Sequence, residues 1–351
     1  YIIINLIMDE LKYYKNTSVL VTGGASFIGS HLTEKLLEIG ANITIIDDLS
    51  SGKLENLENI KKEVNFVHGD ARDDSILNQS LKNTDIVFNL AAMHGGRGYI
   101  ETHPVESVNN MVLDHFVFEA ACKNGVETIV HASSACVYPT NLQDSEDNRN
   151  LLSEGDANFD EPGKAFSDGE YGWAKLMGEL QLNAFVKQYG INGVAGRIFT
   201  AYGERENESH AAIALIAKAV LRMDPYPIWG NGQQTRNFTH VQDTVKGLLL
   251  SGTVKDGFST FNIGSSSHHT VLELCEEIFR SIGWSPVDYD FQLDKPVGVK
   301  SRASDNTKIS RKFNWEPDTS LKEGVKRTVE WYVHNLDDTK LENLEYLLME
   351  R

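Results

Sequence analysis

The chain has 351 residues, 41% of them hydrophobic and 24% charged, which is ordinary for a globular protein. Asp and Glu number 50 against 33 Lys and Arg, and the net charge of −17 argues against nucleic acid or an anionic membrane as partner. No apolar run reaches the ~18 residues that a membrane span needs. The three cysteines, Cys122, Cys136 and Cys275, have neither paired nor metal-ligand spacing, so the sequence predicts a reducing cytoplasm and no metal site.

The length allows one large α/β domain with an appendage, or two domains in one chain. Residues 1–15 are expected to form an N-terminal extension, in which Met8 is a candidate biological start. The residues before Met8 would then belong to an upstream or added segment. We assign the extension no function.

A glycine-rich turn follows the first expected strand, residues 18–21, and leads into a helix that stops at Gly40. Such a turn lets backbone amides and the helix dipole face a pyrophosphate. The second expected strand, residues 43–46, delivers Asp47, which lies 18 residues after Gly29 and near the ~20-residue spacing at which an acid meets the adenosine ribose. Because a carboxylate there accepts from both ribose hydroxyls and repels a 2′-phosphate, the pattern favours NAD over NADP. The alternative is a glycine turn with a solvent-exposed acid after a strand.

Further strands are expected at residues 64–67 and 85–92, and a helix at residues 105–123. Strands and helices that alternate in this way predict a doubly wound parallel sheet, a Rossmann-type α/β fold. The small residues near Ala92 would allow a cofactor to approach the backbone closely.

The stretch from His131 to Pro139 carries hydroxyl and thiol side chains directly after a short β-branched strand, at the edge where open α/β sheets bind ligands. Tyr171 and Lys175 are four residues apart, which places them on one face of a helix. A lysine ammonium beside a phenol stabilises the phenolate, and the Ser134 hydroxyl can hydrogen-bond the same oxygen. The constellation predicts a tyrosine that acts as acid and base on a sugar or alcohol hydroxyl, although such a pair also occurs by chance on many helices.

The segment between these motifs, residues 141–170, is acidic and lacks apolar periodicity. It predicts a long surface loop that either covers the site or is merely decorative. After the Tyr171 helix, the pattern predicts a hairpin over residues 225–238 with its turn at Asn231 and Gly232. The other expected elements are a strand at 194–199 and helices at about 211–221, 241–251, 271–282 and 321–335.

Together these motifs resemble those of extended short-chain dehydrogenases/reductases of the NAD-dependent nucleotide-sugar epimerase/dehydratase family, in register from about Ser18 to Asn335. The resemblance implies that Tyr171 is the base, that Lys175 lowers its pKa and holds the nicotinamide ribose, and that Ser134 assists. It places the cofactor against Gly23, Ser26, Phe27, Ile28, Gly29, Asp47, Asp70, Ala71, Leu90, Ala91, Ala92, Asn110 and Lys175. It places the sugar nucleotide against Gly95, Gly96, Arg97, Thr200, Arg236 and Arg302, the last two on its diphosphate.

The resemblance also implies a division of the chain. We expect an NAD-binding Rossmann domain at residues 16–196 with about 236–263, and a C-terminal tail at 336–351. A smaller mixed α/β nucleotide-sugar-binding region, residues 197–235 and 264–335, would lie at the C-terminal side. A homodimer is expected, because helices of this type commonly form a four-helix interface.

Two side chains indicate a subfamily. The run from Ala132 to Pro139, with Gly95 and Gly96 before it, is similar to the GDP-mannose 3,5-epimerase family and to the GDP-fucose-forming epimerase-reductases. In both, a cysteine at the position of Cys136 is an acid/base on the sugar ring, and in the second a histidine at the position of His210 is its partner. The alternatives are a small buried cysteine and a surface histidine near a helix start. Two departures from the family pattern are Ser26, in place of the middle glycine of the turn, and Thr200, where asparagine is common.

The sequence therefore predicts an NAD-dependent nucleotide-sugar epimerase that works through a transient 4-keto sugar. A ketone at C4 makes the hydrogens at C3 and C5 abstractable, and Cys136 and His210 would exchange these protons on a GDP-hexose. The alternatives are a 4-epimerase of the UDP-glucose or UDP-uronate type, a nucleotide-sugar dehydratase or reductase, and a non-catalytic NAD-binding scaffold.

Overall fold

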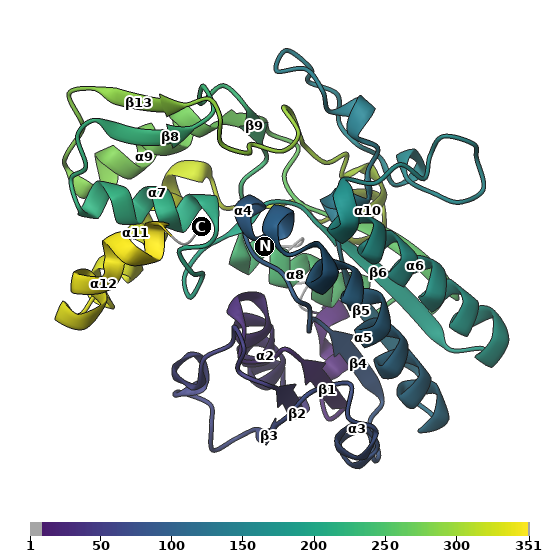
Figure 1. Cartoon of the computed structure of the whole chain (residues 1–351). Coiled ribbons are helices and arrows are strands. Elements are labelled where there is room, and N and C mark those ends of the chain that lie inside the picture. Colours follow the sequence, from purple (N-terminus) through teal and green to yellow (C-terminus); the bar gives the residue numbers. More distant parts are fainter. Residues whose placement is uncertain (1–8, 350–351) are drawn as a thin grey trace.

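Seven parallel strands form the central sheet of the computed structural model, which describes residues 9–349 and so leaves the candidate start Met8 outside the described residues (Figure 1). The strands lie in the order β3-β2-β1-β4-β5-β6-β11. Their bounds are Ser18–Thr22 (β1), Asn42–Asp47 (β2), Asn65–His68 (β3), Ile86–Asn89 (β4), Thr128–Ser134 (β5), Asn192–Ile198 (β6) and Phe258–Ile263 (β11). The strand order reverses between β1 and β4, and open α/β sheets bind ligands at the carboxyl edge of such a point. The doubly wound parallel sheet predicted from the sequence is confirmed.

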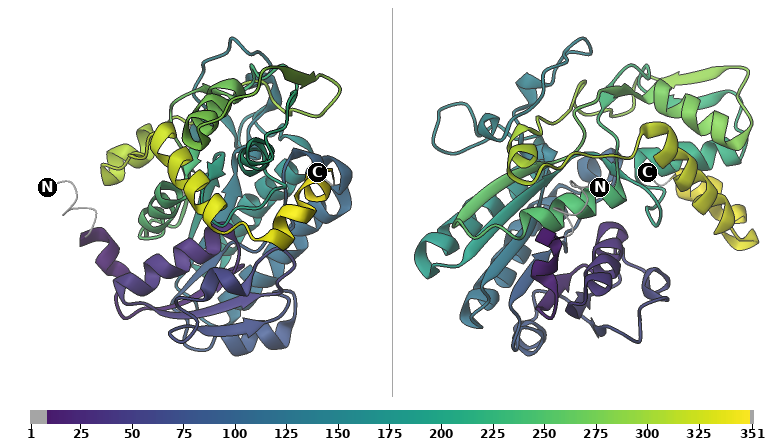
Figure 2. Two further views of the ribbon diagram at one scale, coloured as in Figure 1. Left: turned by 90° about the vertical axis from the view of Figure 1, so that its left-hand side faces the viewer. Right: turned by 180° about the vertical axis from the view of Figure 1, so that it is seen from behind.

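Helices cover both faces of this sheet (Figures 1 and 2). Their bounds are Phe27–Ile39 (α2), Asp74–Ser80 (α3), Pro104–Lys123 (α5), Gly169–Tyr189 (α6), Val241–Ser251 (α8) and Thr307–Phe313 (α10). Along β1, Val19 and Val21 join the core shared with α2 and α8, while Leu20 joins the core under α5. Because the central strands are buried on both faces, their sequences are continuous apolar runs and not alternating polar and apolar residues. In the part of the chain that the structure describes, no helix has the length and apolar character needed to cross a membrane.

The described part of the expected N-terminal extension packs into this core. Leu11 and Tyr14 are fully buried there, and the Tyr14 hydroxyl donates a hydrogen bond of 2.6 Å to the Leu249 carbonyl of α8. Residues 9–15 therefore pack as part of the region built on the central sheet.

A second, smaller region packs against the carboxyl edge of the sheet (Figure 1). Its helices are Ala211–Val220 (α7), Val271–Ile282 (α9), Leu321–His334 (α11) and Asp338–Met349 (α12). Thr270 and Glu273 form a capping box at the start of α9, and Gly283 ends that helix with a positive φ of 71°. Leu344 of α12 is buried in the core of this region, so the segment expected as a C-terminal tail contains a packed helix.

The hairpin predicted over residues 225–238 is wrong. A turn does form, with positive φ at Gly230 and Gly232, but the two flanking strands leave it for different partners. Strand β8 (Tyr226–Trp229) pairs in parallel with β13 (Tyr289–Gln292), and β9 (Thr235–Arg236) pairs antiparallel with β12 (His269–Thr270). Both pairings are long-range, so a local turn signal could not reveal them.

The loop at residues 141–170 is anchored to the sheet by Arg197 of β6. This guanidinium is almost fully buried and pairs with Glu179 of α6 at 2.7 Å. It also donates hydrogen bonds to the carbonyls of Glu154 and Ala157 in the loop, at 2.9 and 2.8 Å. The loop is therefore held in place by buried polar contacts rather than lying loosely on the surface.

Candidate active site

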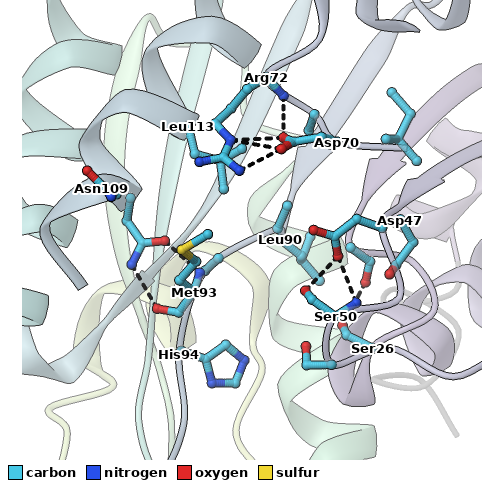
Figure 3. Close-up of a pocket in the computed structure, with 18 of the residues that line it drawn as sticks. Ser26, Asp47, Ser50, Asp70, Arg72, Leu90, Met93, His94, Asn109 and Leu113 are labelled. Carbon is cyan, nitrogen blue, oxygen red and sulfur yellow. Dashed lines mark hydrogen bonds and ion pairs between the residues drawn. The ribbon is translucent and has the colours of Figure 1, made fainter. Parts of the chain in front are cut away.

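Two adjoining cavities follow the carboxyl edge of the sheet at the point where the strand order reverses. The first, which we call the small cavity, has a volume of ≈ 60 Å³ and is shown in Figure 3. The second, the large cavity, has a volume of ≈ 360 Å³ and lies between the sheet and the smaller region. Four residues line both: Ser26, Leu90, Ala92 and His94. A ligand in one cavity would therefore adjoin a ligand in the other.

The glycine turn after β1 forms one wall of the small cavity. Gly23 has a positive φ of 71°, and a Cβ there would lie 2.9 Å from the backbone nitrogen of Ala91, so only glycine lets these segments approach. Ser26 is the N-cap of α2: its hydroxyl accepts from the Gly29 amide at 3.3 Å and donates to the Gly23 carbonyl at 2.6 Å. The serine that departs from the family pattern thus closes the turn itself. Gly29 lines neither cavity, because it packs against the Gly23 carbonyl.

The Asp47 carboxylate lies at the end of β2 in the small cavity (Figure 3). One oxygen accepts from the Ala25 amide and the other from the Leu49 amide, both at 2.9 Å. Burial raises its pKa, and these two hydrogen bonds lower it. Each carboxylate oxygen retains capacity to accept a hydroxyl, so the residue fits the ribose of a dinucleotide bound against the glycine turn.

The remaining residues expected to contact the cofactor, apart from Gly29, are divided between the two cavities. Asp70, Ala71, Leu90, Ala91, Ala92 and Asn110 line the small cavity, and Phe27, Ile28 and Lys175 line the large one. The Asp70 carboxylate is bound by Arg72 at 2.6 Å, which lowers its pKa. The Asn110 side chain accepts from the Met93 amide at 2.7 Å and donates to the Met93 carbonyl at 2.9 Å. Asn110 therefore fixes the backbone of the segment after β4.

Tyr171, Lys175 and Ser134 come together in the large cavity, as the sequence predicts. The Lys175 ammonium lies 5.9 Å from the centroid of the Tyr171 ring, and the Ser134 hydroxyl hydrogen-bonds the phenol. Burial raises the pKa of the Tyr171 phenol, the charges of Cys136 and Asp114 raise it further, and the bond to Ser134 lowers it. The lowering that the resemblance assigns to Lys175 is not among these effects. Burial lowers the pKa of Lys175, and the Asp114 charge opposes this.

Cys136 stands beside Tyr171 because the start of α6 packs on its backbone. A Cβ at Gly172 would lie 2.3 Å from the Cys136 carbonyl, and the Asp168 amide donates to that same carbonyl at 2.9 Å. The Cys136 thiol accepts a hydrogen bond of 3.5 Å from Arg302. A thiol, a phenol and an ammonium thus share one wall of the large cavity.

Three arginines face this wall. Asp168 bridges two of them, with Arg97 at 2.9 Å and Arg302 at 3.0 Å. Arg236, the third, is held by the carbonyls of Thr235 and Val297 at 2.8 Å, and burial followed by the Arg302 charge lowers its pKa to about 9. All three guanidiniums line the large cavity, so they can receive a dianionic diphosphate.

His210 and His94 meet at the other side of the large cavity. Their ring centroids are 5.5 Å apart in an edge-to-face arrangement, and Nδ1 of His210 lies 3.4 Å from the buried Glu206 carboxylate. Gly96 allows this meeting, because a Cβ there would lie 1.8 Å from the Ser209 carbonyl. The other residues expected to contact the sugar nucleotide, Gly95 and Thr200, also line the large cavity.

Sequence reasoning missed three charged or polar groups of the site: His94, Asp168 and Glu206. Asp168 lies three residues before Tyr171, and Glu206 lies four residues before His210, so nearness to a known motif could have found both. His94 stands next to Gly95, but its partner His210 is more than 100 residues away in the chain. Only tertiary structure reveals that pair.

Comparison with known proteins identifies the family of this chain. The profile of the NAD dependent epimerase/dehydratase family matches residues 19–264. A GDP-mannose 3,5-epimerase of Oryza sativa subsp. indica is 33% identical over 339 residues, which cover 93% of this chain and 84% of the relative. A putative UDP-glucose 4-epimerase of Methanocaldococcus jannaschii is 31% identical over 325 residues, 90% of this chain and 99% of the relative. The structure of a UDP-N-acetylglucosamine 4-epimerase of Methanobrevibacter ruminantium, in complex with UDP-N-acetylmuramic acid, superposes with a TM-score of 0.80 at 29% identity, covering 92% of this chain and 100% of that one.

Proposed function

Because the chain belongs to the NAD-dependent epimerase/dehydratase family and is an NAD-dependent nucleotide-sugar epimerase, we propose that it inverts C3 or C5 of a GDP-linked hexose through a 4-keto sugar. The observation that carries this proposal is that Cys136 and His210 line the same cavity as Tyr171, Lys175 and Ser134. An active site that only oxidises and reduces C4 would need Tyr171, Lys175 and Ser134 but neither Cys136 nor His210.

The residues divide the chemistry among themselves. Bound NAD would supply the hydride acceptor for C4 and the donor that restores it. Tyr171 takes the proton of the C4 hydroxyl and gives it back, with Ser134 bonded to the phenol oxygen. While C4 is a ketone, Cys136 and His210 exchange protons with the adjacent ring carbons. Arg236 and Arg302 would hold the diphosphate, and Asp47 with the glycine turn would hold the cofactor.

Solvent deuterium tests this proposal. The enzyme, loaded with NAD and given GDP-mannose in heavy water, should place deuterium at C3 or C5, as read by proton NMR. Cys136→Ser should reduce this exchange at least ~100-fold, the lower range for loss of an acid/base group. The matched control is Cys122→Ser, because Cys122 is a free thiol on α5 that lines neither cavity. Exchange at the wild-type rate in Cys136→Ser would remove Cys136 from the mechanism.

A 4-epimerase of UDP-hexoses is the second candidate. It is favoured by the similarity to the putative UDP-glucose 4-epimerase of Methanocaldococcus jannaschii, which covers almost all of that relative. It requires Tyr171, Lys175, Ser134 and room for the keto sugar to turn over, and the large cavity of ≈ 360 Å³ is consistent with this. Given UDP-glucose, such an enzyme would invert C4 and leave C3 and C5 free of deuterium.

We further propose a homodimer built on α5 and α6. These helices lie side by side (Figure 1), and each exposes large apolar side chains one turn or two turns apart. On α5 these are Val105, Val112 and Phe116, and on α6 they are Trp173 and Leu180. Pairing this face with its copy would cover them. A monomeric mass by light scattering would contradict the dimer.

The three cysteines support a cytoplasmic location for this enzyme. Cys122, Cys136 and Cys275 are all free thiols in the structure. A reducing compartment keeps Cys136 as the thiol that the proposed chemistry uses. Cell fractionation with an antibody against the chain checks the location.

A further inference from the structure

His94 lies where the two cavities meet. It is one of the four residues that line both, and its side chain is exposed to the space that they enclose. Figure 3 shows its imidazole projecting into the space beside Met93 and Ser26. Within residues 9–349, neither ring nitrogen has a protein hydrogen-bond or ion-pair partner, and the ring contacts His210 edge to face. Both nitrogens are therefore available to a ligand.

The segment that carries His94 is fixed on both sides. Before it, Asn110 binds the amide and the carbonyl of Met93. After it, the backbone at Gly96 packs against the Ser209 carbonyl so closely that a side chain could not be accommodated. These contacts hold His94 against His210. The ring is thus positioned precisely but left without polar partners, which is the arrangement expected of a group that acts on substrate.

The charges around the two histidines differ. His94 lies near the Lys175 ammonium, and burial together with that charge lowers the pKa of His94 to about 4. At neutral pH its imidazole is uncharged and has a lone pair to accept a proton. His210 has the Glu206 carboxylate 3.4 Å from Nδ1, so a positive charge on its ring is balanced. His94 is therefore neutral at rest, and a proton that it receives would pass readily to His210, whose charge Glu206 balances.

We propose that His94 is a further catalytic residue, the base that removes a proton from the ring carbon next to the C4 ketone and passes it to His210. The C–H bond breaks, its electron pair stays on the sugar as the enolate, and an N–H bond forms on His94. That N–H bond then breaks as a new one forms on His210, which Glu206 balances. The Cys136 thiol supplies the proton that re-forms the C–H bond and becomes a thiolate, and the proton on His210 returns to it through solvent in the cavity. This inference rests on the proposed function, in which NAD is the oxidant that makes the ketone.

The test uses His94→Gln in the full chain, with His94→Ala as a second variant. The matched control is His103→Gln, because His103 lies nine residues further on, stacks on Tyr99 and lines neither cavity. With NAD and GDP-mannose in heavy water, both His94 variants should lose ring-carbon exchange at least ~100-fold. Formation of reduced cofactor, read by its absorbance in a single turnover, should still occur, because C4 oxidation uses Tyr171, and this reading separates loss of the ring-carbon base from loss of the hydride step.

The outcomes separate this inference from the proposed function. Exchange at the wild-type rate in both His94 variants would overturn the inference and leave the function intact. Inversion at C4 without deuterium in the wild type would overturn both the C3 or C5 assignment and the role of His94. If the wild type turns over none of GDP-mannose, UDP-glucose and UDP-glucuronate, the proposed function fails. The protonation of His94 is then measured by NMR titration of its ring. The His94→Gln variant assigns the signal. Titration near the ordinary histidine pKa of ~6.5 would then overturn the neutral base.

Discussion

The two halves of the site are encoded differently. On the dinucleotide side, the groups of the glycine turn and the acid after β2 lie where strands end, as Ser26 does at the N-cap of α2 and Asp47 at the end of β2. On the sugar side, the groups meet through contacts between distant segments, as in the pair of Asp168 and Arg302 and the pair of His94 and His210. The difference teaches that the cofactor half can be read from local spacing, whereas the sugar half depends on tertiary packing.

The largest expected effect comes from breaking the anchor that joins the loop of residues 141–170 to the sheet. Glu179→Ala leaves Arg197 buried without its carboxylate partner, and removing one member of a buried ion pair costs about 3–5 kcal/mol. Urea unfolding should show this loss. The matched control is Glu170→Ala, because Glu170 is exposed in the first turn of the same helix and should change stability by less than about 0.5 kcal/mol. A loss below about 1 kcal/mol in Glu179→Ala would mean that the sugar side does not depend on this anchor.

A smaller effect is expected from the bridge between the arginines. Asp168→Asn removes the charge that holds Arg97 and Arg302 together, and charge-assisted hydrogen bonds of this kind contribute roughly 1–3 kcal/mol. Burial raises the pKa of Asp168, but the charges of Arg302 and Arg97 outweigh it, so its pKa in the folded protein lies below the ordinary value. Its contribution is therefore complete above pH ~4 and is lost as the pH falls through the folded pKa.

Thermal unfolding from pH 7 to pH 3 checks this sign. The gap in stability between wild type and Asp168→Asn should be constant from pH 7 to about pH 5 and should close below about pH 4. A gap that widens on acidification would show that Asp168 is not ionised in the folded protein, and the bridge would then be a neutral hydrogen bond.

The same contrast explains what the sequence predicted. The order of strands and helices in the dinucleotide half follows from apolar periodicity and turn residues, and the pairing of Tyr171 with Lys175 follows from their spacing of four. The pairing of β8 with β13 does not, because β9, β10, α8, β11, β12 and α9 lie between the partners in the chain, and the turn signal at Asn231 and Gly232 describes only a local turn. Asp168 and Glu206 lie within four residues of a recognised motif, yet their roles depend on contacts with distant segments, Asp168 with Arg302 and the His210 beside Glu206 with His94.

The smallest effect tests how far local spacing can be trusted, because two adjacent acids follow β2 and spacing alone does not choose between them. The structure distinguishes the two acids: the Asp47 carboxylate is buried against the Ala25 amide of the glycine turn, whereas Asp48 is exposed and its carboxylate binds Ser50.

Asp47→Asn removes the carboxylate that would accept the ribose hydroxyls and repel a 2′-phosphate. The preference for NAD over NADP, measured by equilibrium binding, should therefore fall about tenfold, which corresponds to about 1.4 kcal/mol. Asp48→Asn should change it less than about twofold, since its charge is directed to solvent. If Asp48→Asn has the larger effect, the ribose lies outside the turn, and the cofactor half of this site depends on tertiary packing as much as the sugar half does.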